Sequence, residues 1–218
     1  LYIVHKLAPK VPESRSKALE GGCEKFTYNL AHKMSIDHKV FILYIGLTDK
    51  SKRTFYLHSI EDFQNQLVEE YVVDSKFERL SIFTDLLDQY NIDLIHYQHL
   101  VYSPLEYTLV AKAKGVPQIL SLHDFYYICE EHFLENDKFV PCDVPTDITQ
   151  CATCLRNKDQ IPHEHVLKRR SMMKSLLQKM DLITAPSKFL RTQYHKIFPE
   201  INDKLKIVEL GTLLDNLK

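Results

Sequence analysis

Short apolar runs alternate along this chain with longer segments in which apolar residues repeat at helical spacing. The runs that predict β-strands are LYIVHKLAP (1–9), KVFILYI (39–45), IDLIHYQ (92–98), QILSL (118–122), DLITAP (181–186) and KLKIVEL (204–210). Strands joined by helices pair in parallel through right-handed crossovers, and strands that are apolar nearly throughout are buried on both faces. The alternation therefore predicts an α/β fold built on a Rossmann-like, doubly wound and mostly parallel sheet.

The segments between these runs predict helices. One helical face is formed by Cys23, Phe26, Thr27, Leu30, Ala31 and Met34. Further helices are expected at about 77–90, 104–114, 166–180 and 189–198, with Gly115 ending the second of these four and Ser187 capping the last. Region 47–76 is ambiguous: RTFYLHSI (53–60) predicts a strand, and SIEDFQNQLVEEY (59–71) predicts a short helix.

Composition narrows the classes of protein. The chain has 218 residues, of which 44% are hydrophobic and 26% charged, as in an ordinary globular domain. A net charge of −1 gives no reason to expect a nucleic-acid partner. No apolar run reaches the roughly 20 residues that a membrane-spanning helix needs, and no export signal is visible, so a cytoplasmic location is expected.

The domain organisation expected from these patterns is simple. Residues 1–205 are predicted to form one Rossmann-like domain with an irregular, cysteine-rich insert at 125–162. Residues 206–218 are predicted to hold the final strand and the start of an interdomain linker. Because the chain begins inside a predicted strand, we expect it to have been trimmed at its front.

Two adjacent glycines, Gly21 and Gly22, lie between the first predicted strand and the first predicted helix. Glycine allows close approach of a ligand to the backbone, and the start of a helix offers N–H groups to an anion. The pair is not a GxGxxG fingerprint, and no acidic residue clearly ends the second strand, which disfavours an NAD-type dehydrogenase.

Ionisable residues follow two of the predicted strands. His123 and Asp124 come directly after 118–122, and His96 and His99 lie at the end of 92–98. Ligands of open parallel sheets bind outside the carboxyl ends of the strands, so these side chains are candidates for lining one crevice. The alternative is that the histidines are polar strand ends and that Asp124 caps a turn.

Four of the five cysteines lie close together in the sequence: Cys129, Cys142, Cys151 and Cys154. A CxxC pair with two further cysteines nearby can enclose a tetrahedral structural zinc ion, and His132 or His163 can replace one cysteine. Metal binding would also supply folding energy that a segment poor in apolar residues lacks. The alternatives are free thiols or one disulfide formed on oxidation.

The predicted helix at 165–180 combines an apolar stripe with basic residues, which are Lys168, Arg169, Arg170, Lys174 and Lys179. Such a helix can rest on an anionic membrane surface, which would make the protein peripheral at the inner face of the cell membrane. The alternative, which we favour, is that the apolar side packs on the sheet and the charges are solvated.

Several of these motifs occur together in one known family. GGCEKFTYNLAHKM, DLIHYQHL, GVPQILSLHDFYYIC, CATC, DLITAPSKFL and KIVELG resemble, in this order, the N-terminal domain of retaining family 4 glycosyltransferases of GT-B fold. The resemblance covers almost the whole chain. The cysteines resemble those of a subgroup that builds surface polysaccharides and carries a cysteine-rich insert.

The resemblance implies the acceptor-binding half of an enzyme that moves a hexosyl group from a nucleotide-diphosphate sugar to a saccharide or lipid-linked acceptor. It implies that Gly21 and Gly22 approach the donor diphosphate and that His123 lies near the transferred sugar as the catalytic residue. It also implies that Gln98, His99 and Asp124 border the acceptor. No cofactor is expected for the chemistry, and the zinc would be structural.

This sequence also departs from the family. The Glu-x7-Glu segment and the phosphate-binding Arg/Lys pair belong to the donor-binding C-terminal domain, which is expected to be absent here, and Leu210-Gly211 stands where the family often has Asn-Gly. The chain alone is therefore expected to be inactive. The competing hypothesis is a non-catalytic, zinc-stabilised protein-interaction module on a Rossmann-like scaffold.

Overall fold

The structure is a computed structural model that describes residues 1–5, 21–47, 53–61, 64–73 and 75–211. The chain divides into two compact units, one of Leu1–Ser121 with the residues from Leu210 onward and one of Leu122–Glu209. The two units are described separately below. Predictions on 6–9, on 48–52 and on the linker from 212 lie outside the described residues.

The first unit is a sheet flanked by helices. Its elements are β1 (Tyr2–Val4), α1 (Gly22–Met34), β2 (Val40–Leu47), β3 (Arg53–Glu61), β4 (Gln64–Val73), α2 (Lys76–Gln89), β5 (Ile95–Tyr97), α3 (Tyr107–Ala113) and β6 (Gln118–Ser121). The strands follow the order β4-β3-β2-β1-β5-β6. Strand β1 pairs in parallel with β2 and β5, and β5 pairs in parallel with β6. The carboxyl ends of β1, β5 and β6 therefore lie at one edge of the sheet.

The prediction of a helix at 59–71 is wrong. Strand β4 occupies most of this range and pairs antiparallel with β3, which itself pairs antiparallel with β2. At the outer edge of the sheet, β4 exposes residues of both faces, including Leu67, Val68 and Val72. An edge strand with both faces exposed to solvent lacks the alternation of apolar and polar residues that marks a strand in sequence. Its pairing with β3 overrides a local preference for helix.

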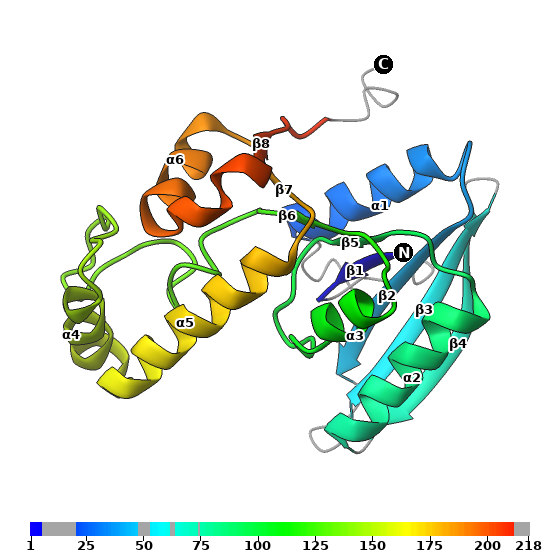
Figure 1. Cartoon of the computed structure of the whole chain (residues 1–218), viewed down its shortest axis with the longest axis horizontal. Helices are drawn as coiled ribbons and strands as arrows, with labels where there is room; N and C mark the ends of the chain where they lie inside the picture. Colours follow the sequence, from blue (N-terminus) through cyan, green and yellow to red (C-terminus); the bar gives the residue numbers. More distant parts are fainter. Residues whose placement is uncertain (6–20, 48–52, 62–63, 74, 212–218) are drawn as a thin grey trace, which may run out of the picture. The chain divides into compact units, whose positions relative to one another are not determined.

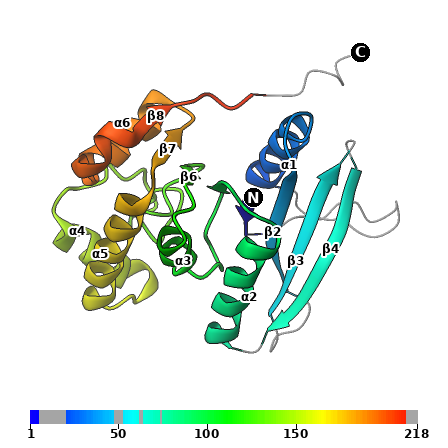
Figure 2. The same ribbon diagram turned by 45° about the vertical axis from the view of Figure 1, so that its right-hand side comes forward.

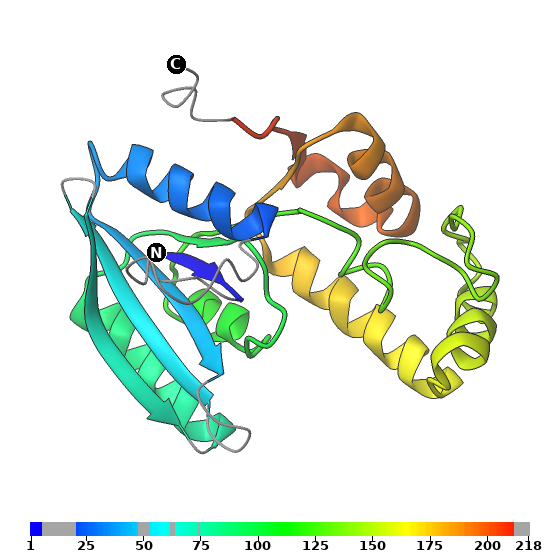
Figure 3. The ribbon, with the colours of Figure 1, turned by 180° about the vertical axis from the view of Figure 1, so that it is seen from behind.

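The helices of this unit cover both faces of its sheet. Helix α1 lies on one face, whereas α2 and α3 lie on the other (Figures 1 and 3). Under α1, the buried side chains are Tyr2, Val4, Ala31, Val40, Ile42, Tyr44 and Ile60. On the opposite side, the stacked rings of Phe83 and Tyr107 have centroids 3.9 Å apart.

The sequence signals at helix ends in this unit are largely confirmed. Gly115 follows the C-cap of α3 with φ of 70°, a left-handed conformation that glycine adopts without strain. Helix α3 begins at Tyr107 and not at Pro104, because 104–107 form a turn. On α1, the predicted apolar face is wrong at Met34, which is exposed. The buried face of this helix instead includes the polar residues Glu24 and His32.

The second unit holds the remaining elements, which are α4 (Ile148–Asp159), α5 (His163–Lys179), β7 (Leu182–Ala185), α6 (Lys188–Ile197), the 3-10 helix η1 (Pro199–Lys204) and β8 (Leu205–Ile207). Strands β7 and β8 pair in parallel. Helices α4 and α5 lie side by side (Figure 2). The predicted N-cap is confirmed, because Ser187 Oγ accepts from the Leu190 N–H at 3.2 Å.

The segment 125–162, predicted to be irregular, contains helix α4. Asp147 caps its start by accepting from the Thr149 N–H. Gln160, at φ of 58°, ends it in the left-handed conformation that glycine usually supplies, so the usual sequence signal for a helix end is missing.

Across the described residues there are eight strands, and parallel pairings outnumber antiparallel ones. Helices flank the strands. The predicted α/β, Rossmann-like class with a mostly parallel sheet is therefore confirmed.

Candidate functional site

Helix α1 begins at the two predicted glycines. Gly21 is the N-cap, both glycines are exposed, and no side chain of the described residues caps the first turn. Neither glycine has the positive φ that would by itself require glycine. Among the described residues, an added Cβ at Gly22 would meet no atom within 4 Å. This exposed helix start has the arrangement of backbone N–H groups that can bind anions.

Gly21 has a different reason to be glycine. A Cβ at this position would lie 2.5 Å from Glu24 Oε2, and Glu24 is itself buried to 7% exposure. Glu24 Oε1 lies 3.1 Å from His5 Nε2, so the carboxylate is held on the side toward β1. The absence of a side chain at Gly21 makes room for this carboxylate.

The histidine that contacts Glu24 connects α1 to the end of β5. The ring of His5 packs edge-on against His99, with centroids 4.9 Å apart. Backbone N–H of Val101 donates to His99 Nδ1 at 3.1 Å, which fixes that ring nitrogen as an acceptor. Glu24, His5 and His99 thus form a continuous polar cluster beside the start of α1.

Gln98 lies at the same place. It is fully buried, and its backbone N–H donates to the Ile3 carbonyl at 2.7 Å. Cys23 Sγ lies 3.9 Å from the Gln98 carbonyl, which brings the first turn of α1 against the end of β5. Within the first unit, the structure therefore brings Gly21, Gly22, Gln98 and His99 to one edge of the sheet.

His96, the other histidine of β5, lies apart from this cluster. It points to the neighbouring strand, where its Nε2 lies 2.8 Å from Ser121 Oγ, and its ring packs on Tyr2. Of the two possibilities for His96, the structure favours a polar residue satisfied within the sheet.

His123 and Asp124 begin the second unit. The Leu122 N–H donates to the Thr184 carbonyl at 2.8 Å, so this segment runs beside β7. His123 and Asp124 are half-buried. Asp124 Oδ1 accepts from the Tyr126 N–H at 2.8 Å, and its Oδ2 lies 3.8 Å from His132 Nδ1.

Asp124 thus does cap a turn, as one of the two alternatives predicted, while its second oxygen faces a histidine. The main chain here is also anchored, because Tyr194 donates its hydroxyl proton to the Asp124 carbonyl at 3.0 Å. Complete burial raises the pKa of Tyr194 well above its usual value, so this hydroxyl stays a donor. Hydrogen bonds to β7 and α6 therefore hold the backbone around the His-Asp pair.

The four clustered cysteines lie elsewhere in the second unit. Cys129, Cys142, Cys151 and Cys154 line one cavity of about 540 Å³. All four are free and half-buried. The histidines considered as substitutes do not line this cavity: His132 faces Asp124, and His163 begins α5 in an exposed position.

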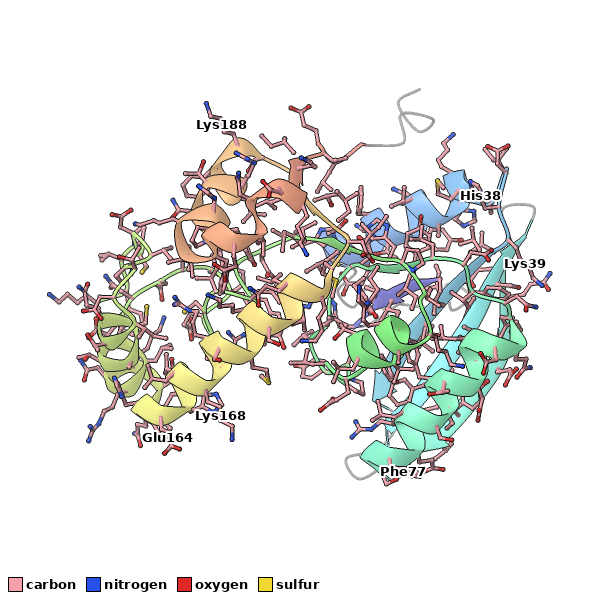
Figure 4. All side chains as sticks on the ribbon, viewed as in Figure 1. His38, Lys39, Phe77, Glu164, Lys168 and Lys188 are labelled. Atoms are coloured by element: carbon pink, nitrogen blue, oxygen red, sulfur yellow. The ribbon has the colours of Figure 1, made fainter. Side chains whose placement is uncertain are left out.

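The basic residues of α5 are used mainly inside the second unit. Arg169 is buried, forms an ion pair with Glu130 at 2.9 Å and donates to the Tyr126 carbonyl. Lys174 pairs with Glu200 at 3.0 Å. Lys168 is exposed near the N-terminal end of the helix (Figure 4). The prediction that the basic residues are solvated is therefore wrong for Arg169, which is buried and paired, whereas Lys168 is exposed as that interpretation expects.

Sequence reasoning assigned no role to two residues that organise these places, His5 and Glu24, and it considered His132 only as a metal ligand. Glu24 stands in the Gly-Gly-x-Glu pattern, which was a usable signal, but its pairing with His5 joins residues 19 positions apart. His132 lies in a loop without periodicity. Such pairings come from tertiary structure, and no local pattern marks them.

A family model described as Glycosyltransferase Family 4 matches residues 20–215, which is most of the chain. The match starts just before Gly21 and includes both units. No curated protein matches the chain significantly. None of the helices in the described part of the chain is long and apolar enough to cross a membrane.

Proposed function

The chain belongs to glycosyltransferase family 4, and from this premise we propose that it is the acceptor-binding half of a retaining, hexosyl-type enzyme. The donor would be a nucleotide-diphosphate sugar, and the acceptor a saccharide or lipid-linked sugar in surface polysaccharide or glycan synthesis. One observation carries the proposal: Gly22 opens α1 with no described atom near its Cβ position, beside the strand end that holds Gln98 and His99.

The first turn of α1 would bind the donor diphosphate. Backbone N–H groups at a helix start carry partial positive charge, so they bind phosphate oxygens without a lysine or arginine. Glu24 lies in the same turn, and its carboxylate would repel a diphosphate if it turned toward it. Its contact with His5 holds it aside, which makes His5 a positioning residue in this proposal.

The catalytic residue of the proposal is His123. As the donor bond breaks, negative charge grows on the leaving diphosphate, and a histidine N–H near it stabilises that charge. Gln98, His99 and Asp124 are proposed to border the acceptor. The hydrogen bonds that anchor Asp124 at both its carboxylate and its carbonyl suit a residue that orients a sugar hydroxyl.

Sugar transfer requires the donor-binding half of the GT-B architecture, so we propose that these residues act only with that half present. The test is a transfer assay with a panel of nucleotide-diphosphate sugars and a lipid-linked acceptor. Product configuration is followed by NMR. We expect the product to keep the anomeric configuration of the donor, and we expect His123→Ala to lower kcat while leaving the thermal midpoint unchanged. An inverted product, or full activity of His123→Ala, would contradict the proposal.

Peripheral attachment to the cytoplasmic face of a membrane is a separate part of the proposal. It would suit a lipid-linked acceptor, but in α5 it rests chiefly on Lys168, because Arg169 and Lys174 are paired within the unit. Co-sedimentation with anionic vesicles tests it. If Lys168→Glu binds the vesicles as well as the parent does, α5 is not the attachment surface.

A further inference from the structure

Three separate segments of the second unit bring sulfur atoms to one cavity. Cys129 ends the turn that starts at Phe125, Cys142 lies in the following loop, and Cys151 and Cys154 lie on α4. Residues three apart on a helix share a face, so the CxxC pair presents both sulfur atoms to the same side. The fifth cysteine, Cys23, belongs to the first unit.

The four thiols are electrostatic neighbours. Cys129 lies within electrostatic range of Cys151 and of Cys142. Cys142 also lies within electrostatic range of Cys151 and of Cys154. Cys142 is therefore close enough to the other three cysteines to influence each of them.

Each of the four sulfur atoms also accepts a hydrogen bond from an N–H donor. The pairs are the Glu131 backbone with Cys129, the Val144 backbone with Cys142 at 3.3 Å, the Asp137 backbone with Cys154, and the Arg170 guanidinium with Cys151 at 3.6 Å. Such donors stabilise a negatively charged thiolate far more than a neutral thiol. Burial by itself favours the neutral thiols, and these donors partly offset it, so they assist thiolate formation when a metal ion binds.

The cavity wall also attracts cations. Its described lining includes the carboxylates Glu135, Asp137, Asp143 and Asp147. The one basic residue among those lining residues is Lys196, which donates to the Asp143 carbonyl at 2.8 Å. Four soft sulfur ligands select zinc over magnesium or calcium, which prefer oxygen.

We infer that Cys129, Cys142, Cys151 and Cys154 together bind one structural zinc ion as thiolates in a closed tetrahedral site. Zinc–sulfur bonds of about 2.3 Å place the four sulfur atoms about 3.8 Å from one another. In the described part of the chain, no cysteine joins a set of three ligand atoms within 4.8 Å of one another. Zinc binding therefore draws the cavity walls inward.

This inward movement has a structural role. The apolar side chains buried in 125–162 are few: Tyr127, Ile128, Leu134, Val144, Ala152 and Leu155. The metal ties α4 to the loops that carry Cys129 and Cys142, and binding free energy then adds to folding free energy. Since the Cys129 N–H donates to the Phe125 carbonyl at 2.9 Å, the ion also steadies the turn that follows Asp124.

The test measures metal directly and does not depend on sugar transfer. The whole chain is expressed with zinc, purified without chelator and analysed by mass spectrometry for zinc and iron. We expect about one zinc ion per chain in the parent protein. In each serine variant of the four cysteines, the zinc content per chain should be at least tenfold lower than in the parent protein. Cys23→Ser should keep the zinc content of the parent protein.

Two measurements on the parent protein hold even where a serine variant does not fold. Removal of zinc with a strong chelator should lower the thermal midpoint, and added zinc should restore it. Replacement by Co²⁺ should give intense sulfur-to-cobalt charge-transfer bands together with the visible bands of a tetrahedral site. A chain without bound zinc, an iron–sulfur chromophore, a disulfide among these cysteines, or equal zinc loss in Cys23→Ser would overturn the inference.

Discussion

Replacing Gly22 by alanine should separate stability from activity. An added Cβ would meet no atom of the described residues within 4 Å, and the backbone there is not left-handed, so the folded state should accept alanine without strain. Alanine restricts the unfolded chain more than glycine does, which stabilises a protein by about 0.4–1 kcal/mol. For a chain of 218 residues this corresponds to a rise in Tm of about 1–4 °C.

The same methyl group should impair sugar transfer. A phosphate oxygen that accepts a hydrogen bond from the first N–H groups of α1 lies about 2.9 Å from the donor nitrogen. The methyl group of alanine would occupy the space next to this position and hinder the approach of the phosphate. Loss of one charge-assisted hydrogen bond removes about 1.5–3 kcal/mol. Each 1.36 kcal/mol is tenfold in rate, so kcat/KM should fall by about 10- to 150-fold.

The assay pairs thermal unfolding of the chain with transfer kinetics in the presence of the donor-binding half. Gly21→Ala serves as the matched control, because its Cβ would lie 2.5 Å from Glu24 Oε2 and force that carboxylate away from His5. This variant should lose stability, by about 1–3 kcal/mol, because a buried polar contact is broken. Unchanged kcat/KM in Gly22→Ala would refute the diphosphate role, and a lowered Tm in that variant would refute the steric reasoning.

Three further predictions concern stability. Phe83→Ala should lower the free energy of unfolding, measured with denaturant, by about 3–5 kcal/mol, because Phe83 is 1% exposed and stacked on Tyr107. The control Phe77→Ala should lower it by under about 0.5 kcal/mol, because Phe77 is 83% exposed, and similar losses in both variants would contradict the described core. Ser187→Ala should cost about 1 kcal/mol through loss of the N-cap of α6, and a cost near zero would argue against that cap. Burial lowers the pKa of His58 below 6.5, so the unfolded state binds a proton at a higher pH than the folded state does, and the stability of the fold should fall as the pH drops through about 6.5. In His58→Gln, Tm should depend less on pH. An unchanged slope of Tm against pH would exclude His58 as the source of this dependence.

Much of the fold could be predicted because the signals are local. The run at 118–122 is apolar with few breaks, Gly115 ends the helix before it, and Ser187 caps a helix through an oxygen three residues from its donor. Apolar periodicity and capping depend on neighbours within one or two helical turns, so they are visible in sequence alone. Strand β4 was mistaken for a helix because only its pairing with β3 defines it.

The sequence by itself determined which residues could take part in a site: the glycines before α1, the polar residues after β5 and β6, and four cysteines in one segment. Only the tertiary structure decided how they combine. It placed Glu24 against His5, showed Gly22 open and Gly21 crowded, and aimed four N–H donors at the cysteine sulfur atoms. The physical reason is range, because side-chain type and periodicity are properties of the local chain, whereas contacts across tens of residues exist only once the chain has folded.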